Sequence, residues 1–276
     1  MNKILRIALI LLLTPVLLCM TACTKAQSDS MTLVVFKVGQ ADAMVLRSPH
    51  GVIMIDTGED DDGAELLKYF KNTNISTINY LIITHFDKDH VGSADTLVEN
   101  MKIKHVFVPN YTGSGKQYEQ YVQAMADYNI KAKTIKKKTT VSLPGGTISF
   151  TLYPAAQANY AASNDNNQSL VISLTHGENS FLFTGDAETE RIDELLQMGN
   201  LSHTFLKVPH HGVYCEKSEE FFQAVSPKYA VITCSDKNPE DEETVSALED
   251  LGAKVYLTRD GNVTCVSDGH TLTVTQ

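Results

Sequence analysis

The chain has 276 residues, of which 43% are hydrophobic, and its formal net charge is −10. This length and apolar content suffice for one large domain with a core, or for two small domains. The excess of acidic residues repels polyanions at long range, so non-specific binding to nucleic acid is disfavoured unless positive charge is clustered locally.

The N-terminal residues predict a secretory signal. Lys3 and Arg6 form a short basic start, and an almost unbroken apolar run extends from Ile4 to Met20. This run is too short and too one-sided for a good membrane-spanning helix. Loss of the two basic residues with the signal would change the formal charge from −10 to −12.

The signal ends in Thr21-Ala22-Cys23, which resembles the lipobox of bacterial lipoproteins, although Met20 stands where that motif usually has Leu. The resemblance implies that Cys23 becomes the lipidated first residue of a protein anchored to the outer face of the bacterial cytoplasmic membrane. Ordinary signal cleavage and an uncleaved anchor are the alternatives. We therefore expect a signal peptide at residues 1–22, a polar tether at 23–30 and one domain at 31–276.

Short strands alternate with helices from residue 31 onward, and no low-complexity linker divides them. Two β-rich halves, each with helices, suggest two packed sheets with helices outside. The expected helices lie at 63–71, 90–100, 115–129, 188–197, 218–225 and 242–251. The expected strands lie at 31–36, 43–46, 52–55, 78–83, 103–109, 139–143, 147–153, 169–174, 180–184, 204–208, 229–234, 254–257, 263–266 and 271–274.

Four potential metal ligands follow the strand expected at 78–83. His85, Asp87 and Asp89 alternate, and His90 adds a fourth as the chain turns toward a helix. A strand end that becomes a loop can aim alternate side chains into one pocket. Imidazole and carboxylate together suit zinc, manganese or iron better than calcium, which prefers oxygen ligands. The alternative is a solvated polar loop with chance histidines, and the buried strand before it argues against that.

Three further strand ends carry the same residue types. Asp186 follows an apolar strand in a Gly-Asp turn, where a carboxylate can bridge two cations about 3.5–4 Å apart. His210 and His211 end another strand, and Asp56 ends a third, where it could orient a ligand histidine. Each has an ordinary interpretation as a polar loop, but their repetition along the chain favours a metal site.

With these motifs, the sequence resembles the metallo-β-lactamase superfamily, and within it the hydrolase domain of the DNA-uptake competence protein ComEC. The resemblance covers residues 31 to about 275 and implies an αββα four-layer sandwich. The motifs that carry it lie at 38–43, 55–58, 84–92, 167–171, 183–186 and 208–212.

The resemblance implies a binuclear centre that holds two divalent ions, zinc or manganese. By position in the motifs, His85 and Asp87 would bind the first ion, Asp89 and His90 the second, and Asp186 both.

One residue of the histidine pair would complete the second site. We favour His211 as this ligand, and we expect His210 to shape the pocket or to assist proton transfer. Asp89 or a neighbouring histidine could accept the proton of the attacking water. Asp89 and His210 are thus the expected catalytic residues.

The sequence departs from the superfamily pattern in places. Asn167 and Ser169 occupy a region where the superfamily usually supplies another histidine, so the first site could be weaker or hold manganese; alternatively, both residues only cap a strand. Val213 stands where the competence proteins commonly have Ser, and acidic residues occupy 240–243. These changes remove polar or basic contacts to phosphate and put nuclease activity in doubt.

Two other features leave alternatives open. A lysine strip, defined here as Lys131, Lys133, Lys136, Lys137 and Lys138, is either a solvated face or an anion-guiding rim beside the active site. Cys215 follows the histidine pair and is favoured as a pocket wall over a soft metal ligand. Five cysteines without a CxxC pair do not indicate a disulfide framework.

The leading hypothesis is therefore a binuclear metal-dependent hydrolase that acts on a phosphodiester, in nucleic acid or in a smaller molecule, outside the cell membrane. The alternative is a non-catalytic surface lipoprotein that keeps the fold and binds a partner. The sequence does not indicate the oligomeric state.

Overall fold

The computed structural model describes residues 29–161 and 164–276. The predicted signal peptide, the predicted lipidation site Cys23 and the tether up to residue 28 lie outside the described residues. None of the helices in the described ranges is long and apolar enough to cross a membrane.

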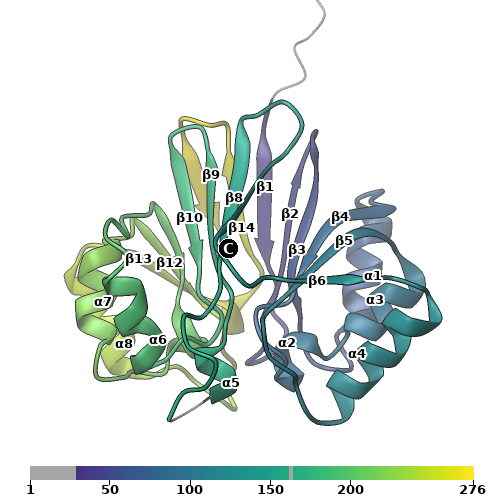
Figure 1. Cartoon of the computed structure of the whole chain (residues 1–276). Coiled ribbons are helices and arrows are strands. Elements are labelled where there is room, and N and C mark those ends of the chain that lie inside the picture. Colours follow the sequence, from purple (N-terminus) through teal and green to yellow (C-terminus); the bar gives the residue numbers. More distant parts are fainter. Residues whose placement is uncertain (1–28, 162–163) are drawn as a thin grey trace, which may run out of the picture.

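The described strands form two sheets that pack face to face (Figure 1). The first sheet has the order β15 (Leu272–Thr275), β14 (Val263–Ser267), β1 (Met31–Val35), β2 (Ala43–Ser48), β3 (Gly51–Thr57), β4 (Thr77–Ile82), β5 (Lys102–Val108) and β6 (Ala132–Thr134). The second has the order β13 (Lys254–Leu257), β12 (Tyr229–Ile232), β11 (Phe205–Lys207), β10 (Asn179–Phe183), β9 (Val171–His176), β8 (Ile148–Tyr153) and β7 (Thr139–Ser142).

Helices cover the outer face of each sheet (Figure 1). The first sheet carries α1 (Gly63–Asn72), α3 (Ala94–Asn100) and α4 (Lys116–Asp127), and the second carries α6 (Thr189–Leu196), α7 (Ser218–Val225) and α8 (Glu242–Asp250). Two single-turn helices, α2 (Lys88–Val91) and α5 (Asn164–Asn167), and two short 3-10 turns, Pro209–Gly212 and Thr258–Asp260, complete the described elements.

Three apolar clusters hold these layers together. The central cluster, which includes Leu33, Phe150 and Phe181, lies between the two sheets. A second cluster joins the first sheet to its helices, and a third joins the second sheet to its helices. The alternation of buried and half-buried residues along β8 is what a strand with one core-facing side requires. The predicted αββα sandwich is confirmed.

The structure differs from the expected elements at two places. The single helix expected at 90–100 is divided into α2 and α3, because Gly92 packs against the backbone of Glu59 and donates a hydrogen bond to the Gly58 carbonyl. Lys133 of the lysine strip lies in β6, a three-residue edge strand that was not expected and that pairs with β5 in parallel. Its exposed residues give no apolar alternation from which a strand could be predicted.

Parallel pairing determines where the site forms. Strands β3, β4 and β5 run parallel in the first sheet, and β10, β11, β12 and β13 run parallel in the second. The loops after the carboxyl ends of such neighbouring strands meet at one edge of each sheet. All the predicted metal ligands belong to loops of this kind.

Candidate metal centre

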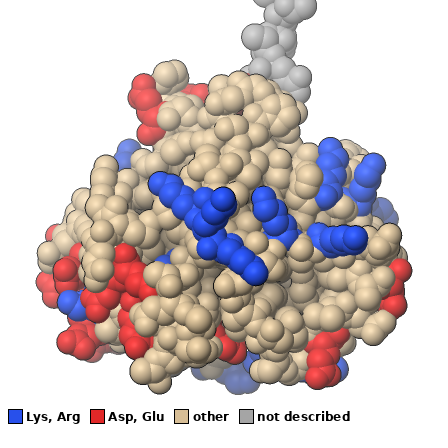
Figure 2. Space-filling view, in the orientation of Figure 1, with Lys and Arg blue, Asp and Glu red and all other residues tan. Residues whose placement is uncertain are grey.

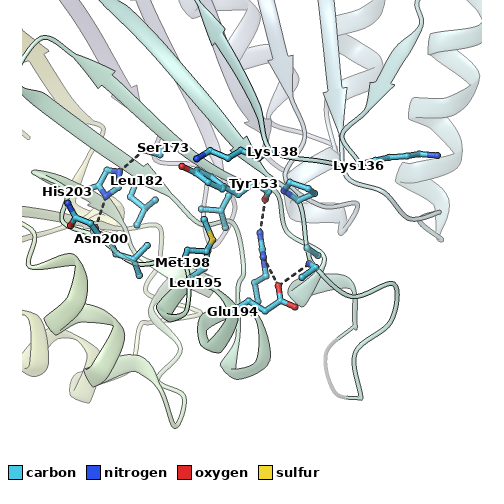
Figure 3. Close-up of a pocket in the computed structure, with 16 residues that line it drawn as sticks. Lys136, Lys138, Tyr153, Ser173, Leu182, Glu194, Leu195, Met198, Asn200 and His203 are labelled. Carbon is cyan, nitrogen blue, oxygen red and sulfur yellow. Dashed lines mark hydrogen bonds and ion pairs between the residues drawn. The ribbon is translucent and has the colours of Figure 1, made fainter.

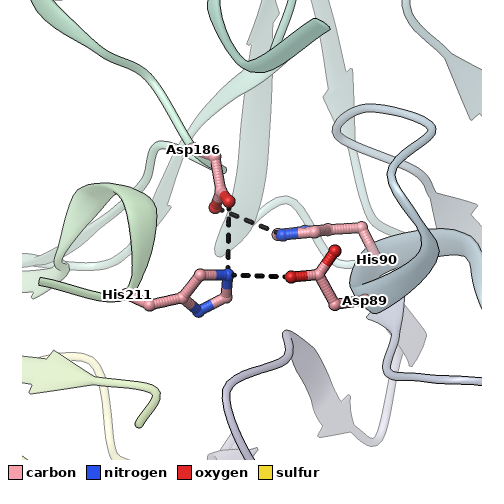
Figure 4. Close-up of side chains that lie close together, drawn as sticks. All are labelled: Asp89, His90, Asp186 and His211. Atoms are coloured by element: carbon pink, nitrogen blue, oxygen red, sulfur yellow. Dashed lines mark ion pairs between the residues drawn. The ribbon is translucent and has the colours of Figure 1, made fainter. Parts of the chain in front are cut away.

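Four side chains converge where the two sheets meet. Asp89 and His90 come from α2, Asp186 follows β10, and His211 lies in the 3-10 turn after β11 (Figure 4). One ligand atom from each lies within 4.8 Å of the ligand atoms of the other three. Nε2 of His90 and Nε2 of His211 each lie 3.2 Å from Asp186, and Nε2 of His211 lies 3.5 Å from Asp89.

The buried atoms of this cluster fit a cation. Nε2 of His85, His90 and His211 and Oδ1 of Asp186 are buried without a partner in hydrogen-bond geometry among the described residues. Buried polar atoms in proteins nearly always have a partner, so several orphaned atoms that face one point indicate a missing group. Imidazole nitrogens and carboxylates are ligands for a divalent transition metal.

Asp56 orients His90. Its Oδ2 lies 2.9 Å from Nδ1 of His90, while Thr84 donates to both of its oxygens, through the backbone N–H and the hydroxyl, at 2.7 Å each. Asp56 thereby holds a proton on Nδ1 of His90, so Nε2, which faces Asp186, is the atom that would bind an ion once it is deprotonated. The orienting role expected of Asp56 agrees with this geometry.

A second buried carboxylate, Asp42, orients His211 through Thr233. Nδ1 of His211 lies 2.9 Å from the Thr233 hydroxyl, which donates to Asp42 at 2.6 Å. The other Asp42 oxygen lies 2.6 Å from Nζ of Lys207, and neither side chain is exposed. This Asp42 network, defined as Asp42, Lys207, Thr233 and His211, holds Nε2 of His211 toward Asp89 and Asp186.

Asp42, Lys207, Thr84 and Thr233 are the contributors that the sequence analysis did not assign to the site. Lys207 carried a usable signal, because it is the charged last residue of an otherwise apolar strand of the second sheet that is buried throughout. A lysine at such a position needs a buried anion. Asp42 lies in the motif at 38–43, but the motif does not show that Lys207 is its partner.

The residues expected at the first metal site are more loosely arranged. Nε2 of His85 lies 3.8 Å from Asp87 and 3.9 Å from Asp186. The side chain of Asp87 is 42% exposed, whereas those of His85 and Asp186 are buried. The second site therefore offers the more enclosed set of ligands.

Asn167 and Ser169 lie behind this first site. Asn167 accepts hydrogen bonds from the backbone N–H groups of Glu188 and Arg191, at the start of α6. The Ser169 hydroxyl accepts from the Asp186 backbone N–H at 3.1 Å and lies 3.4 Å from Nδ1 of His85. Asn167 thus caps a helix, and Ser169 supports two predicted ligands.

His210 and His211 point to different sides of the turn. Both have positive φ angles, 44° and 52°, a conformation that non-glycine residues rarely adopt. His211 is 2% exposed and faces the cluster, whereas His210 is 25% exposed and lies 3.1 Å from Glu188 and 3.9 Å from Asp186. The structure thus brings His211, and not His210, into the four-residue cluster.

Residues 36–233 match the family model described as "Metallo-beta-lactamase superfamily". The chain belongs to this superfamily. ComE operon protein 3 of Bacillus subtilis is 29% identical over 220 residues, which are 73% of this chain and 28% of the relative. Recombination protein 2 of Haemophilus influenzae is 28% identical over 244 residues, which are 86% of this chain and 28% of the relative.

These relatives confirm the predicted resemblance to ComEC-like competence proteins. The chain spans just over a quarter of their length. Among solved structures, the metallo-beta-lactamase fold protein YhfI from Bacillus subtilis aligns with a TM-score of 0.61 at 10% identity, covering 87% of this chain and 100% of YhfI. This likeness concerns the fold alone.

Cys215 and the lysine strip lie apart from the superfamily's metal cluster. Sγ of Cys215 lies 3.4 Å from the Ser218 hydroxyl, and the side chain packs against the apolar cluster under α7. Lys136 and Lys138 line a different cavity, which contains none of the predicted metal ligands (Figure 3).

Nearby carboxylates favour the protonated forms of His90 and His211, whereas His85 is neutral. Burial opposes the charge on His211, but Asp186 and Asp89 more than offset it and raise the pKa of His211 to about 9. The pKa of His90 is also raised despite burial, by Asp186 and Asp56. Burial lowers the pKa of His85 to about 3, so His85 offers a free lone pair at neutral pH.

The contacts of the Asp42 network predict an effect on zinc affinity. We expect Asp42→Asn to weaken zinc binding by about 10–100-fold, because the Asp42 carboxylate no longer fixes Thr233 and His211. Isothermal titration calorimetry on the protein from residue 24 onward measures this, with the exposed Asp127→Asn on α4 as the matched control.

Asp42→Asn also leaves Lys207 buried without a counter-charge, which destabilises a fold by about 3–5 kcal/mol. The double variant Asp42→Asn/Lys207→Met removes both charges and separates the two effects. We expect it to recover stability in urea unfolding but not zinc affinity. Recovery of both would show that the network supports only the fold.

The raised pKa of His211 predicts a pH dependence with a defined sign. The folded pKa of about 9 exceeds the ordinary 6.5, so the stabilising contribution of protonated His211 is complete below pH 6.5 and is lost as pH rises through 9. Urea unfolding of EDTA-treated protein should therefore show falling stability between pH 6.5 and 9, and His211→Gln should reduce the fall. A metal-free protein that gains stability across this window would contradict the assignment.

Proposed function

We propose that this chain is a binuclear metal-dependent hydrolase of phosphodiester bonds. The observation that carries the proposal is the set of buried, orphaned ligand atoms on His85, His90, His211 and Asp186, in a chain of a superfamily that is generally hydrolytic. When bound, two zinc or manganese ions would supply Lewis acidity and lower the pKa of a bound water.

The distances from Asp186 to the ligand histidines support a role in both proposed sites. Its Oδ1 lies 3.2 Å from His90, while its Oδ2 lies 3.9 Å from His85 and 3.2 Å from His211. In the proposed centre, His85 and Asp87 would hold the first ion, and Asp89, His90 and His211 would hold the second. Asp186 lies between these two sets.

A cavity beside Asp89 carries groups of both charges. It has a volume of about 460 Å³ and is lined by three lysines, Lys37, Lys88 and Lys237, and by four carboxylates, Glu59, Asp61, Asp62 and Asp89. Lys88 pairs with Glu59 at 3.1 Å, whereas Lys37 and Lys237 have no ion-pair partner among the described residues. Lys37 and Lys237 are the groups of the wall that could contact a phosphodiester oxygen directly, while Asp61 and Asp62 in the same wall restrict the site to a small anion.

The surroundings of Asp89 and His210 bear differently on the proposed proton-transfer roles. Burial alone would raise the pKa of Asp89, but the nearby His211 and the charge of His90 lower it, so Asp89 stays ionised, as a metal ligand must, and is a weak proton acceptor. His210 lies at the open edge of the site, 3.1 Å from Glu188, where a ring nitrogen could deliver a proton to a leaving oxygen.

The competence-protein relatives make DNA or RNA one candidate substrate. The acidic surface, with a formal charge of −12 for the mature chain, favours a smaller phosphodiester, since a long polyanion would be repelled outside the local lysines. The signal and lipobox-like sequence support a location outside the cytoplasmic membrane, anchored through Cys23.

Hydrolysis of bis(p-nitrophenyl) phosphate tests the activity. We expect turnover by the protein from residue 24 onward with manganese or zinc, and a loss of at least about 100-fold in Asp186→Ala, because the residue between the two sets of ligands is removed. Asp193→Ala on α6 is the matched control and should retain turnover.

Two negative results of this hydrolysis assay would contradict the proposal in different ways. No turnover with two metals bound per chain would exclude this phosphodiester chemistry and point to another ester or an amide substrate. No turnover and no bound metal would favour a binding module that retains the fold.

The anchor is tested separately. We expect the full chain expressed in a bacterium to fractionate with membranes and to carry a lipid on Cys23 by mass spectrometry of the N-terminal peptide. Cys23→Ser should remove the lipid without changing hydrolysis by the folded protein. A mature N-terminus at another residue would contradict the lipoprotein prediction.

A further inference from the structure

A cavity of about 520 Å³ lies on the outer face of the second sheet, beside α6 (Figure 3). The ends of β8 and α6, the adjoining loops and part of the lysine strip form its walls. Its size falls within the range of small-molecule sites, which are mainly apolar with a few polar groups.

The floor of this cavity is apolar. Val171 and Leu182 come from the sheet, Leu195 from α6, and Leu201 from the loop that follows α6. Met198 stands at the rim with 43% of its surface exposed, which is high for a large apolar side chain. Val171, Leu182, Leu195 and Leu201 are themselves at most 6% exposed, so the apolar surface open to a ligand is mainly that of Met198 and of the half-buried Pro154 and Ala155.

One edge of the cavity is cationic. Nζ of Lys138 lies 5.1 Å from the ring centroid of Tyr153, and Figure 3 shows the lysine extended along this ring. No residue of the lysine strip has an ion-pair partner among the described residues. Figure 2 shows basic side chains gathered across the middle of this face, while acidic side chains concentrate toward its lower edge.

The other ionisable groups of the wall add no free positive charge. Arg191 is buried and donates to Glu194 and to the Tyr153 carbonyl, at 2.7 Å each. Nδ1 of His203 donates to the Leu201 carbonyl, and its Nε2 lies 2.7 Å from the Ser173 hydroxyl. Burial lowers the pKa of His203, so this ring is neutral at physiological pH. Lys138, with Lys136 beside the rim, is the available cation.

We propose that this cavity binds an amphipathic anion, with the anionic head group against Lys138 and the apolar chain against Met198, Pro154 and Ala155, above the buried apolar floor. The site is separate from the metal cluster, and the proposal does not depend on the proposed hydrolase activity.

Octyl phosphate is the probe, with inorganic phosphate and octanol as its charged and apolar halves. We expect octyl phosphate to bind the protein from residue 24 onward at least ten times more tightly than either half, by calorimetry. Nuclear magnetic resonance shifts should map to Tyr153, Leu195 and Met198. Binding should persist in Asp186→Ala, because the metal cluster does not line the cavity.

Matched variants locate the two halves of the ligand. Lys138→Glu should weaken octyl phosphate binding at least tenfold, whereas Lys133→Glu, which changes the same charge on a lysine stacked over Phe107 outside the cavity, should change it less than twofold. Met198→Asp should weaken binding, whereas Val122→Asp, at an equally exposed apolar residue of α4, should not.

Equal effects of Lys138→Glu and Lys133→Glu would show that octyl phosphate responds only to the general surface charge, which would overturn the proposal. Octanol that binds as tightly as octyl phosphate would show an apolar site without anion selectivity, which also overturns it. Loss of binding in Asp186→Ala would place the phosphate at the metal cluster instead.

Discussion

The buried carboxylate of Asp42 is the constraint on which the rest of the site depends. Its side chain contacts Lys207 from the second sheet, while its backbone N–H donates to the carbonyl of the predicted ligand Asp89 and its carbonyl accepts from Gly58. A charge without exposed surface is tolerated only when it is paired and hydrogen-bonded. The same contacts that satisfy Asp42 therefore join the two sheets and fix the loop that carries the ligands.

Three residues at the site have strained backbone conformations that help to orient their side chains. Asp56, His210 and His211 all have positive φ angles; Asp56 is the penultimate residue of β3, and the two histidines lie in the 3-10 turn that follows β11. Such residues cost about 1–3 kcal/mol each and persist where the surrounding structure determines them. Here the surroundings are the sandwich core and the bonds from Thr84 and Thr233, so packing far from the metal centre maintains its geometry.

The sequence predicted the parts that local patterns specify. Alternating and apolar runs identified the strands, and the position of His85, Asp89 and Asp186 after strands indicated a shared edge. The pairing of Asp42 with Lys207 could not be predicted, because the two residues are 165 positions apart and belong to different sheets. The break between α2 and α3 likewise depends on Gly92 packing against Glu59, a contact that no periodicity reports.

The segment around Asn167 and Ser169 shows how this chain differs from the usual superfamily pattern. The region that usually contributes a histidine here fastens α6, through Asn167 at the start of the helix and through the Ser169 carbonyl, which accepts from Nε of Arg191. Ser169 also accepts from the backbone of Asp186. Arg191 lines the outer cavity, so one short segment contacts both the cavity wall and the central carboxylate of the metal cluster.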